Sequence, residues 1–245
     1  MKLLFLLLLI SPAAALVSET DSRDTMVIEN YQADVTGDGE NETIELKGKL
    51  FSPEAQYYQD IWAEITATAG ADWKVSYGGG YEPELQFIDL NHDDIIDIFY
   101  QSPTGGSGGL YTYNLSSFAH GKMSEIELPE QLYVNGQFEE DFKVKIEIVP
   151  NGKPIIMDVK DRSEDYVRLG IYDEAGSLLK HTPIMIDPIA FFAPLLISDS
   201  KGYGLKSYQQ ISGAYHADQL GTIETLWYYE RGKWIILKTE WKPAE

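Results

Sequence analysis

The stretch DVTGDGENETIEL, residues 34–46, is the most informative in the chain because it joins a calcium-loop pattern to the start of a strand. Asp34, Thr36 and Asp38 place oxygen-bearing side chains at alternate positions, and Gly39 follows them. This spacing is close to the calcium loop of an EF-hand, which has ligands at positions 1, 3 and 5, glycine at 6 and glutamate at 12. Three interpretations are open: an EF-hand, a calcium loop of another fold, or a polar turn.

A second stretch, DLNHDDIIDIFY at residues 89–100, aligns with the first on its leading aspartate. Position 12 is Glu45 in one stretch and Tyr100 in the other, so it is not a shared ligand. Both stretches have an oxygen-bearing side chain at positions 1, 3, 5 and 9: Asp34, Thr36, Asp38 and Glu42 in the first, and Asp89, Asn91, Asp93 and Asp97 in the second.

The residues that flank the two loops argue against an EF-hand, which needs an amphipathic helix on each side. Ile44 and Leu46 alternate with polar residues after the first loop. The second loop lies between ELQFI and IIDIFY, which both have the composition of strands. The loops are therefore expected to join strands.

Calcium takes six to eight oxygen ligands, including a backbone carbonyl at position 7. The carbonyls of Glu40 and Ile95 are the expected ligands there, beside the eight side chains. The alternative is a turn held only by bonds between side chains and backbone. In the second loop Asp94 replaces the glycine of position 6, and we expect that site to be the weaker one.

A third and weaker relative is DSKGYGLKS, residues 199–207, where Lys201 stands at the position of an oxygen ligand. We expect a loop that no longer binds calcium, in which Lys201 lies near Asp199, or else a plain surface turn. The leading aspartates are 55 and 110 residues apart (89 − 34 and 199 − 89). A period of 55 predicts another unit near residue 144, where FKVKIEIVPNGKP reads as a hairpin without a calcium loop. Such a period is typical of stacked sheet units such as propeller blades.

Alternating apolar and polar residues predict further strands at 61–68, 143–148 and 167–171. LWYYERGKWIILKTEW, residues 226–241, predicts two strands joined at Arg231-Gly232. The helix-like stretch IDPIAFFAPLLI, residues 186–197, is interrupted by two prolines. We expect an all-β fold, with a propeller-like arrangement of about four small antiparallel sheet units in one domain, residues 26–245.

The N-terminus predicts export. Lys2, the apolar run Leu3 to Ile10 and the small residues Ala13 to Ala15 are typical of a signal peptide, residues 1–15, cut after Ala15. A retained membrane anchor is the alternative, but the run is shorter than a membrane-spanning helix needs. Residues 16–25 are expected to be a flexible segment. The chain has no cysteine, so no disulfide stabilises it.

The formal net charge of −20 disfavours nucleic acid and anionic membranes as partners and favours cations. The four histidines show no zinc spacing, and His216 near Asp218 lacks an accompanying nucleophile motif. Acidic pairs such as Glu139 and Glu140 are expected by chance among 39 acidic residues, so a catalytic role is not favoured. TGGSGG, residues 104–109, lacks the lysine of a phosphate-binding loop and reads as a hairpin loop, with ligand contact as the alternative.

The two loops resemble the calcium loops of FG-GAP/VCBS repeat proteins, which run Asp-x-Asn/Thr-x-Asp-Gly-x-x-Asp between strands. With SPTGGSGG and ISGAYHADQLG, the chain resembles secreted VCBS-repeat proteins of spore-forming bacteria. The resemblance implies a propeller-like fold, calcium in the loops and a surface role in binding or adhesion. We therefore expect a secreted or cell-surface calcium-binding module whose partner is a cell-surface polysaccharide or protein. The alternative is a carbohydrate-active hydrolase with structural calcium.

Overall fold

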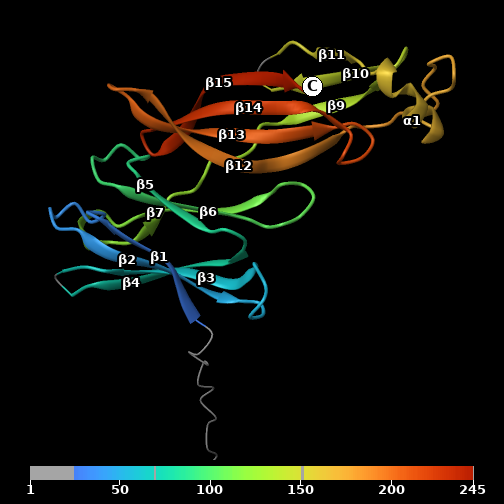
Figure 1. Ribbon diagram of the computed structural model, residues 1–245. Helices are drawn as coiled ribbons and strands as arrows, with labels where there is room; N and C mark the ends of the chain where they lie inside the picture. Colours follow the sequence, from blue (N-terminus) through green and yellow to red (C-terminus); the bar gives the residue numbers. More distant parts are fainter. Residues whose placement is uncertain (1–24, 69, 150–151, 245) are drawn as a thin grey trace, which may run out of the picture.

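The computed structural model describes residues 25–68, 70–149 and 152–244 (Figure 1). The expected signal peptide, residues 1–15, lies outside the described residues, as does the expected flexible segment except for Thr25, which begins the first strand. The described chain forms four antiparallel sheets, each a meander whose strands are ordered as in the sequence. The expectation of an all-β fold with four sheet units is confirmed. Its propeller-like arrangement stays a prediction.

Each sheet is built from one contiguous part of the chain. Sheet 1 holds β1 (Thr25–Ala33), β2 (Glu42–Leu50), β3 (Tyr58–Thr66) and β4 (Asp72–Gly80). Sheet 2 holds β5 (Glu84–Ile88), β6 (Asp97–Pro103), β7 (Tyr111–Ser117) and β8 (Ser124–Glu125). Sheet 3 holds β9 (Val134–Glu139), β10 (Lys143–Ile148) and β11 (Ile155–Asp158). Sheet 4 holds β12 (Met185–Ser198), β13 (Gly202–Ser212), β14 (Gln219–Glu230) and β15 (Lys233–Pro243).

Alternation in the sequence becomes alternation in burial. In β3 the side chains of Ile61, Ala63 and Ile65 are buried. In β10 the buried side chains are Val144, Ile146 and Ile148. The strands predicted at these positions are confirmed, as is the β14–β15 hairpin, whose turn residues Arg231 and Gly232 both have positive φ.

Sheet 2 lies between sheet 1 and the sheet 3–sheet 4 half of the molecule (Figure 1). Consecutive residues of β6 show this directly. Ile98 and Tyr100 belong to the core shared with sheet 1, whereas Phe99 belongs to the core shared with sheets 3 and 4. Both faces of sheet 2 are therefore covered, which explains why β6 is almost continuously buried.

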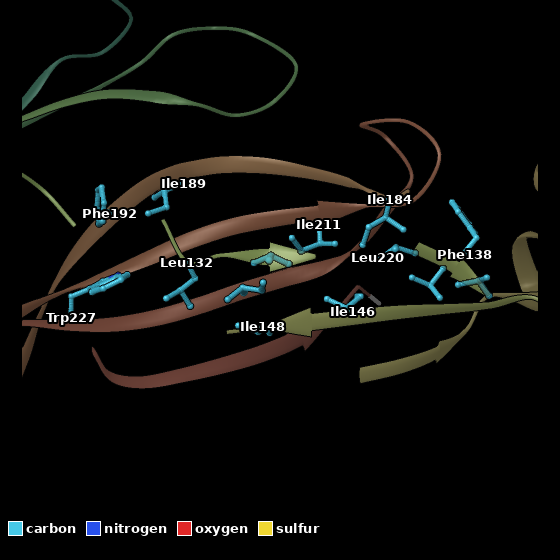
Figure 2. Close-up of a cluster of buried hydrophobic side chains, with 14 of the residues drawn as sticks. Leu132, Phe138, Ile146, Ile148, Ile184, Ile189, Phe192, Ile211, Leu220 and Trp227 are labelled. Atoms are coloured by element: carbon cyan, nitrogen blue, oxygen red, sulfur yellow. The ribbon is translucent and has the colours of Figure 1, made fainter. Parts of the chain in front are cut away.

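The larger core lies between sheets 3 and 4, whose apolar side chains point toward one another (Figure 2). Leu132, Phe138 and Ile146 come from the sheet 3 side, and Ile184, Ile211 and Leu220 come from the sheet 4 side. Ile223 and Trp227 of β14 belong to this core as well.

The strand predicted at 167–171 is wrong, because this segment contains the end of the helix α1 (Ser163–Arg168) and the turn after it. Glu164 and Asp165 lie in the first turn of α1, where negative charge is favourable. Gly170 has φ +67 just beyond the helix, in the left-handed conformation that commonly ends one. Two short 3-10 turns, Ala119–Gly121 and Lys160–Arg162, complete the helical structure described.

The helix-like stretch 186–197 forms β12, an edge strand of sheet 4. Proline lacks an N–H group, and an edge strand tolerates this loss because one of its sides has no partner strand. The pairing register with β13 shifts between Ile186 and Ile189, at the position of Pro188. The hairpin predicted in FKVKIEIVPNGKP, near residue 144, corresponds to β10 and β11, which pair antiparallel. Within the described ranges, no helix is long and apolar enough to span a membrane.

Candidate calcium loops and an adjoining groove

The first loop, residues 34–42, joins β1 to β2 and is organised by the carboxylate at position 1. Asp34 Oδ1 accepts hydrogen bonds from the N–H groups of Gly37 at 2.7 Å and Asp38 at 3.2 Å. Asp34 Oδ2 accepts one from the N–H of Gly39 at 2.9 Å. The second loop, residues 89–97, joins β5 to β6 in the same way. Its Asp89 accepts from the N–H groups of His92 at 2.7 Å and Asp94 at 3.1 Å.

Position 9 closes both loops from the first residue of the following strand. Glu42 accepts from the N–H groups of Val35 and Thr36 at 2.9 and 3.2 Å and from the Thr36 hydroxyl at 3.2 Å. Asp97 accepts from the N–H groups of Leu90 and Asn91 at 3.0 and 3.1 Å. Both carboxylate side chains are fully buried.

Positions 3 and 5 complete the match. Asp38 accepts from the N–H of Glu40 at 2.9 Å, and Asp93 accepts from the N–H of Ile95 at 3.0 Å. The Asn91 amide donates to Asp93 and to Asp97, both at 3.1 Å. The side chain at position 3 thus bonds to the position 9 carboxylate in both loops, whereas Asp34 and Asp38 accept from backbone N–H groups. The carbonyls of Glu40 and Ile95 follow the position 5 carboxylate in the chain.

The side chains at position 12 have partners outside the loops. Glu45 in β2 pairs with Lys47 at 2.7 Å, and Tyr100 is buried in the core. In the part of the chain that the structure describes, no three His, Cys, Asp or Glu side chains are arranged to hold a metal ion. The bonds above also suit a polar turn, so calcium stays a prediction.

The backbone has positive φ at positions 4 and 6 of both loops. The first loop meets this need with glycines, Gly37 at φ +74 and Gly39 at φ +91. The second loop has His92 at φ +61 and Asp94 at φ +66 in the same places. Side chains other than glycine are strained there, least so for short polar residues. The expectation that the second loop is the less favourable one has this physical basis.

Successive loops touch one another. A Cβ atom on Gly37 would lie 2.7 Å from Ile95 Cδ1, so the first loop packs closely against the second. A Cβ atom on Gly202 would lie 3.4 Å from His92 Nδ1, so the second loop packs against the β12–β13 turn of the third. The three loops therefore lie side by side across sheets 1, 2 and 4.

The third loop does not form the expected contact between Lys201 and Asp199. The Lys201 ammonium lies 4.6 Å from the centroid of the Tyr228 ring, on which the His92 ring also stacks at 4.5 Å. The Tyr228 hydroxyl donates to the carbonyl of Lys201 at 3.1 Å. A ring in the next hairpin thus attracts the ammonium, and only the fold brings that ring within reach.

We expect Gly37→Ala to destabilise the protein more than Gly39→Ala. Both substitutions place a Cβ atom at positive φ, but only Gly37 faces Ile95, whereas nothing lies within 4 Å of a Cβ atom on Gly39. The difference in the free energy of unfolding should be about 1–2 kcal/mol. Denaturant titration measures it, and Ile95→Ala in the Gly37→Ala background should recover part of the loss. Equal losses would contradict the contact between the loops.

A groove of about 810 Å³ adjoins the second loop. It is lined by Asn91 and Asp93 of the second loop, by residues between Ser117 and Glu130, and by residues of the β14–β15 hairpin. Local sequence patterns do not reveal this groove, because its walls come from segments about a hundred residues apart.

The remaining residues that the sequence singled out have structural partners. His216 pairs with Asp187 at 2.9 Å and not with Asp218, which binds Arg162 at 2.6 Å. Glu139 accepts from Gln137, and Glu140 accepts from the N–H of Leu178. Residues 104–109 lie in the β6–β7 hairpin loop, as expected.

Comparison with known proteins relates the chain to a Bacillus subtilis protein. Residues 132–242, which contain sheets 3 and 4, match the family model described as the YybI C-terminal domain. The uncharacterized protein YybI of Bacillus subtilis (strain 168) is 26% identical over 214 residues, which are 82% of this chain and 78% of that protein. The chain is therefore similar to YybI over both of its halves.

Two solved structures also align with the chain, the rhamnogalacturonan lyase YesW and the Bacillus licheniformis rhamnogalacturonan lyase PL11. Each has a TM-score of 0.37 and 13% sequence identity over 89% of this chain. The chain spans 34% of the length of these lyases. A TM-score of this size does not assign a fold family.

Proposed function

We propose that the protein is an exported calcium-binding module with a role in binding or adhesion at the cell surface. The observation that carries the proposal is the shared hydrogen-bond pattern of the first and second loops. In both loops the carboxylate at position 1 accepts hydrogen bonds from the N–H groups of positions 4 and 6. The carboxylate at position 9 accepts hydrogen bonds from the N–H groups of positions 2 and 3. Two loops from different sheets that share this pattern favour a common ligand over two unrelated turns.

Charge supports calcium as that ligand. Among the described residues, no Lys, Arg or His side chain forms an ion pair with a carboxylate of the two loops. Glu42 and Asp97 are nevertheless fully buried. A buried carboxylate without a counter-charge is unfavourable even when it accepts hydrogen bonds. A divalent cation held by Asp34, Thr36, Asp38 and Glu42, or by Asp89, Asn91, Asp93 and Asp97, would supply that charge.

The proposal includes an FG-GAP/VCBS-like, propeller-like arrangement. Four meander sheets, with loops 1, 2 and 3 between the first two strands of sheets 1, 2 and 4, support it. The apolar run Leu3 to Ile10 supports export, and an extracellular setting supplies calcium at the concentrations that weak loop sites need.

Calcium should raise the melting temperature of the mature chain by about 3–10 °C over its value in chelator. Extracellular sites have Kd values of about 10⁻⁴ to 10⁻³ M. At about ten times Kd each site adds roughly 1.4 kcal/mol, and each kcal/mol moves the melting temperature of a chain of this size by roughly 2–4 °C. Thermal unfolding at fixed ionic strength measures the shift.

Magnesium and two variants serve as controls. Magnesium should have much less effect because it demands tighter octahedral geometry. Asp38→Ala should remove one site in calorimetric titration, whereas Lys201→Ala should remove none. An equal shift with magnesium would indicate general charge screening, and no shift with either ion would leave the loops as polar turns.

A further inference from the structure

We propose that the groove beside the second loop binds a short, uncharged saccharide chain. This inference names a ligand class for the binding role and goes beyond calcium, since it depends on side chains of sheets 2 and 4. The groove is bounded by the second loop, by residues 117–130 and by the β14–β15 hairpin.

An aromatic pair held in a fixed orientation lines the hairpin wall. The indole N–H of Trp234 donates to the carbonyl of Glu127 at 2.8 Å. The Trp234 ring meets Tyr229 edge to face, with 5.2 Å between centroids and 71° between planes. Trp234 is half-buried, and the one polar atom of its side chain is already satisfied. A ring in this state contributes apolar surface without losing a hydrogen bond when a ligand covers it, as the C–H face of a sugar ring would.

Exposed charged side chains of both signs line the same groove. Carboxylates come from Asp93, Glu125, Glu127 and Glu130, and ammonium groups come from Lys122 and Lys233. A sugar hydroxyl both donates and accepts hydrogen bonds, so it can use carboxylates and ammonium groups together. A basic peptide would use only the carboxylates and would be repelled by the lysines.

The charge balance excludes an acidic chain as the preferred ligand. Four carboxylates outnumber two ammonium groups in the groove, and the whole chain carries a formal net charge of −20. A polyuronate would be repelled at long range and locally. A neutral polysaccharide segment therefore fits the groove best.

Isothermal titration with cellohexaose, xylohexaose and N-acetylchitohexaose tests the proposal. At least one of these should bind, and Trp234→Ala should weaken its affinity about tenfold or more, the usual effect of losing a central tryptophan contact. Glu130→Ala changes an exposed side chain and should weaken binding several-fold, which keeps the test valid if Trp234→Ala folds poorly. Trp62→Ala in sheet 1 is the matched control and should bind like the parent.

Several outcomes would overturn the assignment. The first is that none of the three hexasaccharides binds, and the second is that both groove variants keep the affinity of the parent. The third is that an oligouronate or hexalysine binds more tightly than the neutral hexasaccharides in the presence of chelator. The titrations are run in excess calcium and again in chelator. Binding in either buffer supports the groove. A different affinity in the two buffers would show that the second loop, whose Asn91 and Asp93 line the groove, contributes to this site.

Discussion

Asp218→Ala should lower the free energy of unfolding by about 3–5 kcal/mol, because it breaks a buried network and leaves a charge without its partner. Asp218 is 6% exposed. Its carboxylate accepts from Arg162 at 2.6 Å, from the Tyr166 hydroxyl at 2.8 Å and from the N–H of Ala214 at 2.8 Å. Burial and the Asp218 carboxylate raise the pKa of Tyr166, so this hydroxyl stays a donor.

The network joins α1 to the loop before β14, so its loss should weaken the attachment between sheets 3 and 4. The melting temperature should fall by roughly 6–20 °C, at about 2–4 °C for each kcal/mol. Asp165→Ala is the matched control, since Asp165 pairs with Arg168 on the surface at 2.7 Å and such pairs contribute less than about 1 kcal/mol. Similar losses in the two variants would show that the Asp218 network is not structural.

Metal-free protein should lose stability as pH rises from about 4 to 7, by up to roughly 4 kcal/mol through Asp97 alone. Desolvation by burial raises the pKa of Asp97 to about 7. The N–H groups of Leu90 and Asn91 lower this pKa, and the nearby Asp93 and Asp89 carboxylates raise it.

The direction in which stability changes with pH follows from the number of protons that the folded and unfolded states bind. Between the ordinary pKa of aspartate and the raised one, the folded state holds a proton that the unfolded state has released. Stability in this window therefore falls with increasing pH, and the loss is complete above about pH 7. The surface carboxylates Glu64 and Glu240, whose pKa values are lowered by lysine partners, act in the opposite direction and only below the ordinary carboxyl range.

Asp97→Asn isolates this contribution, because the amide is nearly the same size and does not titrate. Denaturant titrations in chelator at several pH values should show a flatter dependence in the variant than in the parent. Parallel curves would mean that Asp97 is already ionised throughout. Glu174→Gln, which changes an exposed loop carboxylate, provides the comparison for charge removal alone.

The sequence predicted well those features that depend on neighbouring residues. The two loops, the strands around Ile61 and Val144 and the turn at Arg231 each follow from local spacing, and the structure contains all of them. The position 9 carboxylates could be identified because the two loops can be compared with one another. Each of these carboxylates begins the strand after its loop and accepts hydrogen bonds from the N–H groups of positions 2 and 3 of the same loop.

The sequence failed where distant contacts decide the structure. Five alternating residues at 167–171 were too few to outweigh the acidic first turn of α1. Residues 186–197 form an edge strand because β13 pairs with one side of it, which no local pattern shows. Arg162 meets Asp218 across 56 residues, and Trp234 meets Glu127 across 107, so neither the buried network nor the groove could be predicted.

The central position of sheet 2 has a consequence for the order of folding. Meander sheets close through short loops, so each sheet can form from one contiguous segment. Sheets 1 and 2 can bury their shared core as soon as residues 25–125 are available. The other face of sheet 2, with Leu90, Phe99 and Leu115, is buried only when the segment that contains sheet 4 arrives. Until then that apolar face is exposed to solvent. A chain that is synthesised from its N-terminus therefore passes through a state in which sheet 2 is prone to aggregate.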